Sequence, residues 1–342
     1  MGLLLDLAKK YKVLSIIGMA KNAGKTTALN YLIEEAMDDG MILGITSTGR
    51  DGETEDLVTG TEKPRVYLDN GTIVSVPTQL YELSTAGLEI VERLPYSTSI
   101  GELLLCRVKS AGYVQIAGPV AAQDTKRMCK NMFNLGVELI MIDGAIDRKS
   151  VAAPDTSDAV ILATGAVLSR SMNKVVEETA HIVNLYSLPE LEEGEVRDLL
   201  LKNITGKVTD TVMLIDKDNN LKKLNLTSGL GASSEINSEI DDDTRFVYIP
   251  GAFTSSVYSD IELKKFKHVR FILKDPTRIF VKPIDWNILR KKGFNVSVLK
   301  NIEIAAITVN PWAPLGYTFD SDLLVTEMKK AIPDIPVIDV RK

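Results

Sequence analysis

Short apolar runs alternate with amphipathic stretches in the first part of the chain. Residues 13–17 form an apolar, β-rich run that ends at Gly18, which predicts a buried strand. Leucine, isoleucine and alanine then recur at helical spacing over residues 27–39, and Gly40 is a suitable C-cap. Residues 41–46 are a second apolar run. A strand, a loop, a helix and a strand in this order predict the opening unit of a parallel α/β sheet.

The same alternation continues to the end of the sequence. Residues 66–68 and 72–74 flank Asn70-Gly71, a dipeptide typical of tight turns, so we expect a β-hairpin there. An acidic stretch at 188–195 is a candidate domain boundary. Further strands are expected at 101–108, 113–116, 139–142, 159–163, 246–249, 269–273, 296–299, 304–309 and 336–340. Helices are expected at 125–135 and 171–185, after 254, near 286–292 and at 320–331.

Composition narrows the class of protein. At 342 residues the chain is long enough for two domains, because single cores stop growing near ~250–300 residues. A net charge of −6 argues against a nucleic-acid-binding protein, which carries a basic excess. Two cysteines, Cys106 and Cys129, are too few for a disulfide framework. The apolar start is too short for a signal peptide or a membrane span, so we expect a cytoplasmic protein.

The loop between the first strand and the first helix carries the strongest motif. Residues 18–27 read GMAKNAGKTT, close to the Walker A pattern G-x-x-x-x-G-K-[ST], with Met19 in the place of the first glycine. In that pattern backbone N–H groups wrap phosphates, the lysine reaches the outer phosphates and the Ser/Thr hydroxyl binds Mg²⁺. Lys25 and Thr26 take these two roles here. The residues expected to bind a nucleotide are Gly18, Asn22, Ala23, Gly24, Lys25, Thr26 and Thr27. The sequence therefore predicts an α/β fold of the P-loop NTPase type, a mostly parallel sheet flanked by helices, over residues 1–200. A second α/β domain without an assigned role is expected over 201–342.

Acidic residues after two other strands are candidates for the metal side of this site. Asp143 ends the run 139–142 and precedes a glycine, so it is either a Mg²⁺-side catalytic carboxylate or a turn initiator. Asp51 and Glu53 follow the second strand, at the sheet edge where ligands of open α/β sheets bind. Asp51 is the first candidate to hold Mg²⁺ or position water and Glu53 the second, unless the segment is only a polar connection. Asn310 follows the run 304–309 and is a candidate for reading a base edge.

Four segments of the first half resemble one protein family. Residues 18–27, 48–53, 142–148 and 158–166 are similar to the reactivase subunit of lysine 5,6-aminomutase, which is encoded beside adenosylcobalamin-dependent aminomutases. The second half matches that family only in length and α/β pattern. More distantly, the chain resembles the P-loop proteins of the dethiobiotin synthetase type.

The resemblance implies an ATPase that uses ATP and Mg²⁺ to drive exchange of a damaged cobalamin cofactor in an aminomutase. It implies the aminomutase and a second reactivase subunit as partners, and it allows a homodimer. The D-x-H-x-x-G pattern that supplies a cobalamin ligand is absent from the sequence. Two alternatives stay open. One is an ATP-dependent ligase of the dethiobiotin synthetase type, with a small carboxylate held by residues 50–53. The other is a nucleotide-dependent binding module without turnover.

Overall fold

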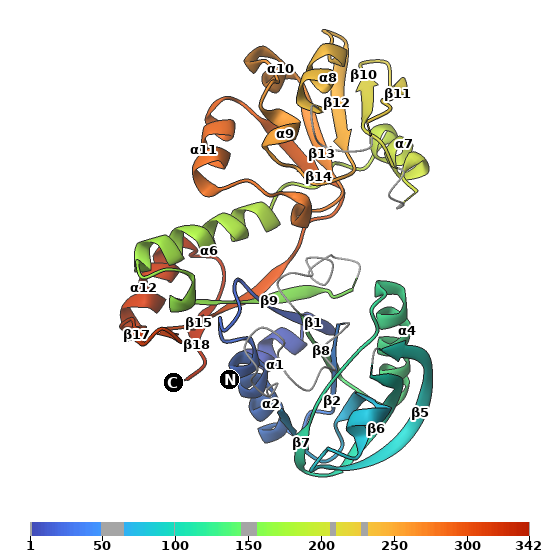
Figure 1. Ribbon diagram of the computed structural model, residues 1–342, viewed down its shortest axis with the longest axis vertical. Coiled ribbons are helices and arrows are strands. Elements are labelled where there is room, and N and C mark those ends of the chain that lie inside the picture. Colours follow the sequence, from blue (N-terminus) through green and yellow to red (C-terminus); the bar gives the residue numbers. More distant parts are fainter. Residues whose placement is uncertain are drawn as a thin grey trace. The chain divides into compact units, whose positions relative to one another are not determined.

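The computed structural model describes residues 2–48, 65–98, 100–144, 156–205, 210–226 and 232–341. The chain forms two compact units, each with its own sheet (Figure 1). The first unit contains residues 1–180 and 303–342, and the second contains residues 181–302. The helices in the described part of the chain all fall short of the length and apolar character needed to cross a bilayer.

A nine-stranded mixed sheet organises the first unit. Its strand order is β18-β15-β9-β1-β8-β2-β4-β6-β5. All neighbours from β18 to β4 pair in parallel, whereas β6 pairs antiparallel with both β4 and β5. The strands are β1 (Val13–Gly18), β2 (Leu43–Ser47), β4 (Ile73–Pro77), β5 (Gly87–Thr98), β6 (Gly101–Ser110), β8 (Leu139–Asp143), β9 (Ala159–Gly165), β15 (Ile304–Asn310) and β18 (Val337–Asp339).

Helices and two small ribbons complete this unit. The ribbons pair β3 (Val66–Leu68) with β7 (Gly112–Val114), and β16 (Trp312–Ala313) with β17 (Tyr317–Thr318). The helices are α1 (Leu3–Ala8), α2 (Lys25–Asp38), α3 (Thr78–Tyr81), α4 (Ala122–Asn134), the 3-10 turn η1 (Ala166–Leu168), α6 (Met172–Tyr186), whose last residues belong to the second unit, and α12 (Ser321–Ala331).

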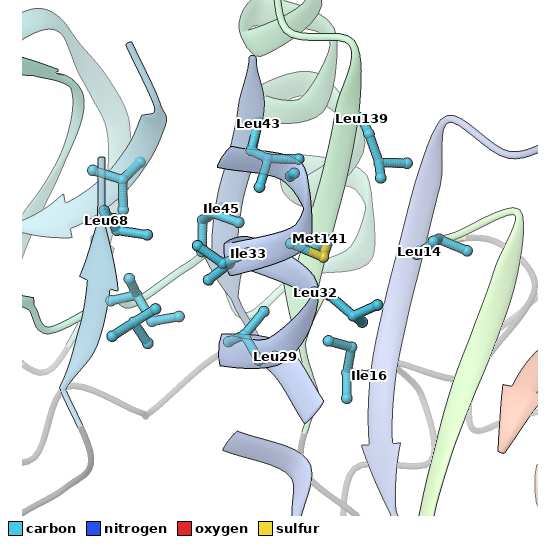
Figure 2. Packing of buried hydrophobic residues seen from close by; sticks show 14 of the residues in the cluster. Leu14, Ile16, Leu29, Leu32, Ile33, Leu43, Ile45, Leu68, Leu139 and Met141 are labelled. Atoms are coloured by element: carbon cyan, nitrogen blue, oxygen red, sulfur yellow. The ribbon is translucent and has the colours of Figure 1, made fainter. Parts of the chain in front are cut away.

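Strand β8 shows how the sheet acquires two covered faces. Its alternate residues Leu139 and Met141 belong to the core cluster that contains the apolar face of α2. Ile140 and Ile142 belong to the cluster that contains the apolar face of α4. Because side chains alternate across a strand, α2 and α4 lie on opposite faces of the sheet. Figure 2 shows Leu29, Leu32 and Ile33 of α2 among side chains of β1, β2 and β8.

The second unit has a five-stranded sheet in the order β11-β10-β12-β13-β14. The last three strands are parallel, and β10 pairs antiparallel with β11 and β12. Its strands are β10 (Met213–Asp216), β11 (Leu221–Lys223), β12 (Thr244–Ile249), β13 (Arg270–Leu273) and β14 (Asn295–Val298). Its helices are α7 (Glu195–Asn203), α8 (Ala232–Glu239), α9 (Ser255–Tyr258), α10 (Leu263–His268), η2 (Pro276–Arg278) and α11 (Pro283–Lys291). The core includes Phe294. The centre of its ring lies 5.0 Å from the centre of the Phe271 ring and 5.2 Å from the centre of the Phe253 ring.

The predicted α/β architecture, with a large mostly parallel sheet flanked by helices, is confirmed. The predicted hairpin is wrong: Gly71 does adopt a left-handed turn conformation (φ 91°), but β3 pairs with β7 while β4 enters the main sheet. Strand β4 is buried along its whole length and pairs with β2 on one side and β6 on the other, so it is an interior strand of the main sheet. The units also divide differently from 1–200 and 201–342, because β15 pairs in parallel with β9 and returns residues 303–342 to the first unit.

Candidate functional site

The 18–27 loop leaves the sheet at the carboxyl end of β1. Ile16 of β1 is in register with Asp143 of β8, so the loop and Asp143 lie at the same edge of the sheet. The Met19 N–H donates to the carbonyl oxygen of Ala163 at 2.8 Å. Met19 therefore continues the pairing of β1 with β9 by one residue, and its bulk is accommodated before the loop turns.

The turn itself depends on two residues with positive φ. Asn22 has φ 64° and Gly24 has φ 100°, and asparagine and glycine are the residue types that tolerate this region best. The Ala28 N–H donates to the Gly24 carbonyl at 2.9 Å, which closes the first turn of α2. The N–H groups of residues 25–27 therefore have no partner within the helix. They lie at the positive end of the α2 dipole, where an anion is stabilised.

An ion pair joins the start of α2 to the end of β8. The Lys25 Nζ atom lies 2.7 Å from Asp143 Oδ1, and the two side chains are 25% and 19% exposed. Because the two side chains are partly buried, water and salt screen their attraction less than they screen an ion pair at the surface. Gly18 makes room for the lysine, because a Cβ atom there would lie 3.2 Å from Lys25 Cγ. The structure thus brings together Gly18, Lys25 and Asp143.

Asn310 comes from the far end of the sequence and lies against the same loop. Its Nδ2 donates to the Asn22 carbonyl at 3.3 Å, and its Oδ1 accepts the Trp312 N–H at 3.2 Å. A Cβ atom on Gly24 would lie 3.0 Å from the Asn310 Cβ. The side chain is buried, so Asn310 positions the loop. An amide can donate twice and accept twice, which leaves it capacity for one ligand contact of each kind.

A small hollow lies beside this contact. Gly24, Thr27, Asn310 and Arg341 are among its lining residues, and it encloses no space large enough for a water molecule. The Arg341 guanidinium carbon lies 5.9 Å from the centre of the Trp312 ring, within cation–π range. Sequence reasoning missed Arg341. Its position directly after the apolar run 336–340 was the available signal, since residues beyond strand ends face the ligand edge.

The remaining predicted residues divide into two groups. Ala23 is buried within the loop, and Thr26 and Thr27 are half-buried in the first turn of α2. Asp51 and Glu53 lie outside the residues that the structure describes. Within the described ranges, no three histidine, cysteine or acidic side chains gather as a ready-made metal cage.

The two cysteines are buried and form no disulfide, and neither has the properties of a nucleophilic thiol. Burial raises the pKa of both the Cys106 and the Cys129 thiol to about 12. A thiolate is the nucleophilic form of cysteine, so both residues act as small apolar side chains at neutral pH.

Comparison of the chain with protein-family models, with curated proteins and with solved structures finds no match.

Proposed function

We propose that the chain binds ATP with Mg²⁺ at the 18–27 loop and hydrolyses it. The observation that carries the proposal is the Lys25–Asp143 ion pair at the N-terminus of α2. A cation, a carboxylate and the N–H groups of one helix turn meet at one sheet edge. These are the groups that bind a triphosphate and its metal ion in phosphoryl-transfer sites.

The loop residues bind the anion. The backbone N–H groups of Gly24 to Thr27 donate to phosphate oxygens, and the helix dipole favours the negative charge there. Lys25 exchanges its contact with Asp143 for a phosphate oxygen, because both partners are anions within reach of the same flexible side chain. Gly18 and Gly24 keep this space free of side chains, since a Cβ at either position meets Lys25 or Asn310.

Thr26 and Asp143 fit the metal side of the site. Mg²⁺ is bound through one or two carboxylates together with substrate phosphates and water, so no all-protein cage is required. The Thr26 hydroxyl and the Asp143 carboxylate, released from Lys25, supply two oxygen ligands. Asp51, and after it Glu53, are proposed on the sequence alone as a further ligand or the group that positions water. When bound, Mg²⁺ neutralises charge that develops on the phosphate oxygens.

The family resemblance indicates a biological role for this activity. We propose that hydrolysis serves a protein partner, an adenosylcobalamin-dependent aminomutase whose damaged cofactor is exchanged, with a second reactivase subunit. In that case the partner raises phosphate release by the chain, and ATP speeds recovery of inactivated aminomutase supplied with fresh cofactor. A purified chain that leaves recovery unchanged with ATP, with and without the second subunit, would contradict this role.

Titration of ATP with and without Mg²⁺, followed by measurement of phosphate release, tests the primary proposal. We expect micromolar to millimolar binding that Mg²⁺ strengthens, and slow release of inorganic phosphate. Absence of ATP binding at millimolar concentration in both conditions would refute it.

A further inference from the structure

We propose that the exposed face of α11 binds an anionic lipid surface, with its isoleucines inserted among the lipid headgroups and the surrounding lysines on the headgroup charges. The inference lies within the second unit and goes beyond the proposed nucleotide site, on which it does not depend. It follows from three observations: an exposed apolar stripe, a local excess of positive charge, and lysines around the stripe that form no ion pair with a described residue.

The apolar stripe runs along the solvent side of α11. Trp286 and Leu289 are buried and attach the helix to the core. Ile284 and Ile288 are 69% and 45% exposed, and Phe280, just before the helix, is 53% exposed. Residues four apart lie on one face of a helix, so the two isoleucines are neighbours on the side opposite the core. Single exposed apolar residues are common, whereas grouped ones mark an interaction site.

The segment that contains α11 is strongly basic. Residues 263–300 include eleven lysine and arginine residues and two acidic ones, Asp275 and Asp285, a net charge of +9 in a chain whose net charge is −6. Positive charge gathered in one segment of an acidic protein attracts an anionic surface to that segment.

Four lysines of this segment lie around the stripe. Lys291 ends α11, one turn beyond the second isoleucine and on the same face, and Lys292 is the C-cap. Lys282 is the N-cap at the other end of the helix. Lys267 lies beside the C-terminal end, because its Cγ would be 3.2 Å from a Cβ atom on Gly293.

These four lysines are exposed, and no carboxylate among the described residues neutralises them. Other cations of the same segment are paired: Lys264 and Lys265 lie within ion-pair distance of Glu262, and Arg270 of Glu192. The charge beside the stripe is therefore available to an external anion.

The helix dipole accounts for only part of this arrangement. Lysines in the last turn of a helix are stabilised by its negative end, and Lys329 and Lys330 end α12 in the same way. The dipole gives no reason for two large apolar side chains to lie in water beside such lysines. The combination of the two residue types is what points to a binding surface.

Lysine and isoleucine together favour a lipid surface over the other anionic partners. Lysine is depleted in protein–protein interfaces, whereas each lysine close to an anionic bilayer strengthens binding by a factor of about five. Apolar side chains gain burial at the boundary between headgroups and acyl chains, which the phosphate backbone of a nucleic acid does not offer. A helix of nine residues lies in the plane of such a surface and is too short to cross it.

Sedimentation of the full chain with lipid vesicles tests the proposal. One vesicle type is pure phosphatidylcholine, and the other is phosphatidylcholine with an equal part of phosphatidylglycerol. Ile284→Gln combined with Ile288→Gln removes the stripe, and Lys291→Gln combined with Lys292→Gln removes charge at its end. Because all four side chains are exposed, both double variants should unfold in urea as the unsubstituted chain does.

Lys329→Gln combined with Lys330→Gln is the matched control, because it removes an exposed lysine pair from the end of another helix. We expect the unsubstituted chain and the control to bind only the anionic vesicles, and to bind them less as salt rises. Each α11 double variant should bind at least about tenfold more weakly, through lost charge in one and lost apolar burial in the other.

Three results would overturn the proposal: no binding to the anionic vesicles, equal binding to both vesicle types, or binding that either α11 double variant leaves unchanged. Poly-glutamate and duplex DNA in solution serve as further probes. Binding to one of them without binding to vesicles, lost in the lysine double variant, would assign the face to an acidic protein or a nucleic acid and would also overturn it.

Discussion

The Lys25 ammonium and the Asp143 carboxylate lie 2.7 Å apart and join the first residue of α2 to the last residue of β8. The two residues are 118 positions apart in the sequence, and their contact depends on the parallel pairing of β1 with β8. An anion at the α2 N-terminus competes with Asp143 for the lysine. A cation at the same place competes with the lysine for Asp143. In the proposed site, this pair is therefore the point at which triphosphate and Mg²⁺ binding would be coupled.

Replacement of Asp143 by asparagine should uncouple the two ligands. Asp143→Asn keeps the shape of the side chain but removes its charge, so Lys25 is freer to bind phosphate while the metal loses its carboxylate. We expect ATP binding to persist without Mg²⁺, Mg²⁺ to give no further gain in affinity, and phosphate release to fall at least about a hundredfold. Calorimetric titrations with and without Mg²⁺ measure this. A full Mg²⁺ effect in the variant would exclude Asp143 from the metal site.

Replacement of Gly24 by alanine should affect both stability and binding. Residue 24 has φ 100°, a conformation that costs an L-residue about 1–2 kcal/mol, and the new Cβ would lie 3.0 Å from Asn310. Gly40→Ala is the matched control, because its φ is 68° and no atom lies within 4 Å of the added Cβ. We expect both variants to lose unfolding free energy in urea, and only Gly24→Ala to lose ATP affinity. Equal ATP binding by the two would mean that the loop conformation does not form the site.

The pattern of the sequence predicted those parts of the fold that depend on local periodicity. The apolar run 13–17 and the helical spacing after Lys25 correspond to β1 and α2, because each buries one continuous surface. Strand β5 was missed: several of its residues are exposed at the edge of the sheet, so burial imposes no apolar run on it. The pairing of β15 with β9 was also missed, since contact between residues more than 140 positions apart leaves no local signal. Asn310 was predicted from its strand-end position, whereas Arg341 was not.

Glu35 should make the stability of the first unit depend on pH. Burial is the main cause that raises the pKa of this carboxyl above its usual 4.5, although its Oε1 accepts the Leu4 N–H at 2.8 Å. A raised folded-state pKa means that the native state holds the proton more tightly than the unfolded state. The contribution of Glu35 to stability is then fully present below the pKa of its carboxyl in the unfolded state. It is lost as pH rises through the pKa of that carboxyl in the folded state. Glu35→Gln keeps the acceptor and removes the titration.

Urea unfolding of Glu35→Gln and of the unsubstituted chain from pH 4 to pH 7 measures the effect. We expect the variant to gain stability relative to the unsubstituted chain as pH rises through this window. Glu34→Gln, which changes an exposed neighbour on the same helix, is the matched control substitution. Parallel pH profiles for all three proteins would show that burial of Glu35 leaves its titration unchanged on folding.

The most direct test of the central claim is titration of Mg²⁺-ATP into Lys25→Ala by isothermal calorimetry. Lys25 is proposed as the one charged side chain of the loop that contacts phosphate, and a hydrogen bond to a charged group contributes about 1.5–3 kcal/mol. Lys9→Ala is the control, because it removes a lysine from an exposed ion pair with Asp6 at the end of α1, outside the 18–27 loop. We predict that Lys25→Ala binds ATP about 10–100-fold more weakly than the unsubstituted chain while Lys9→Ala binds normally. Unchanged ATP affinity in a folded Lys25→Ala variant would contradict the assignment of the 18–27 loop as the phosphate site.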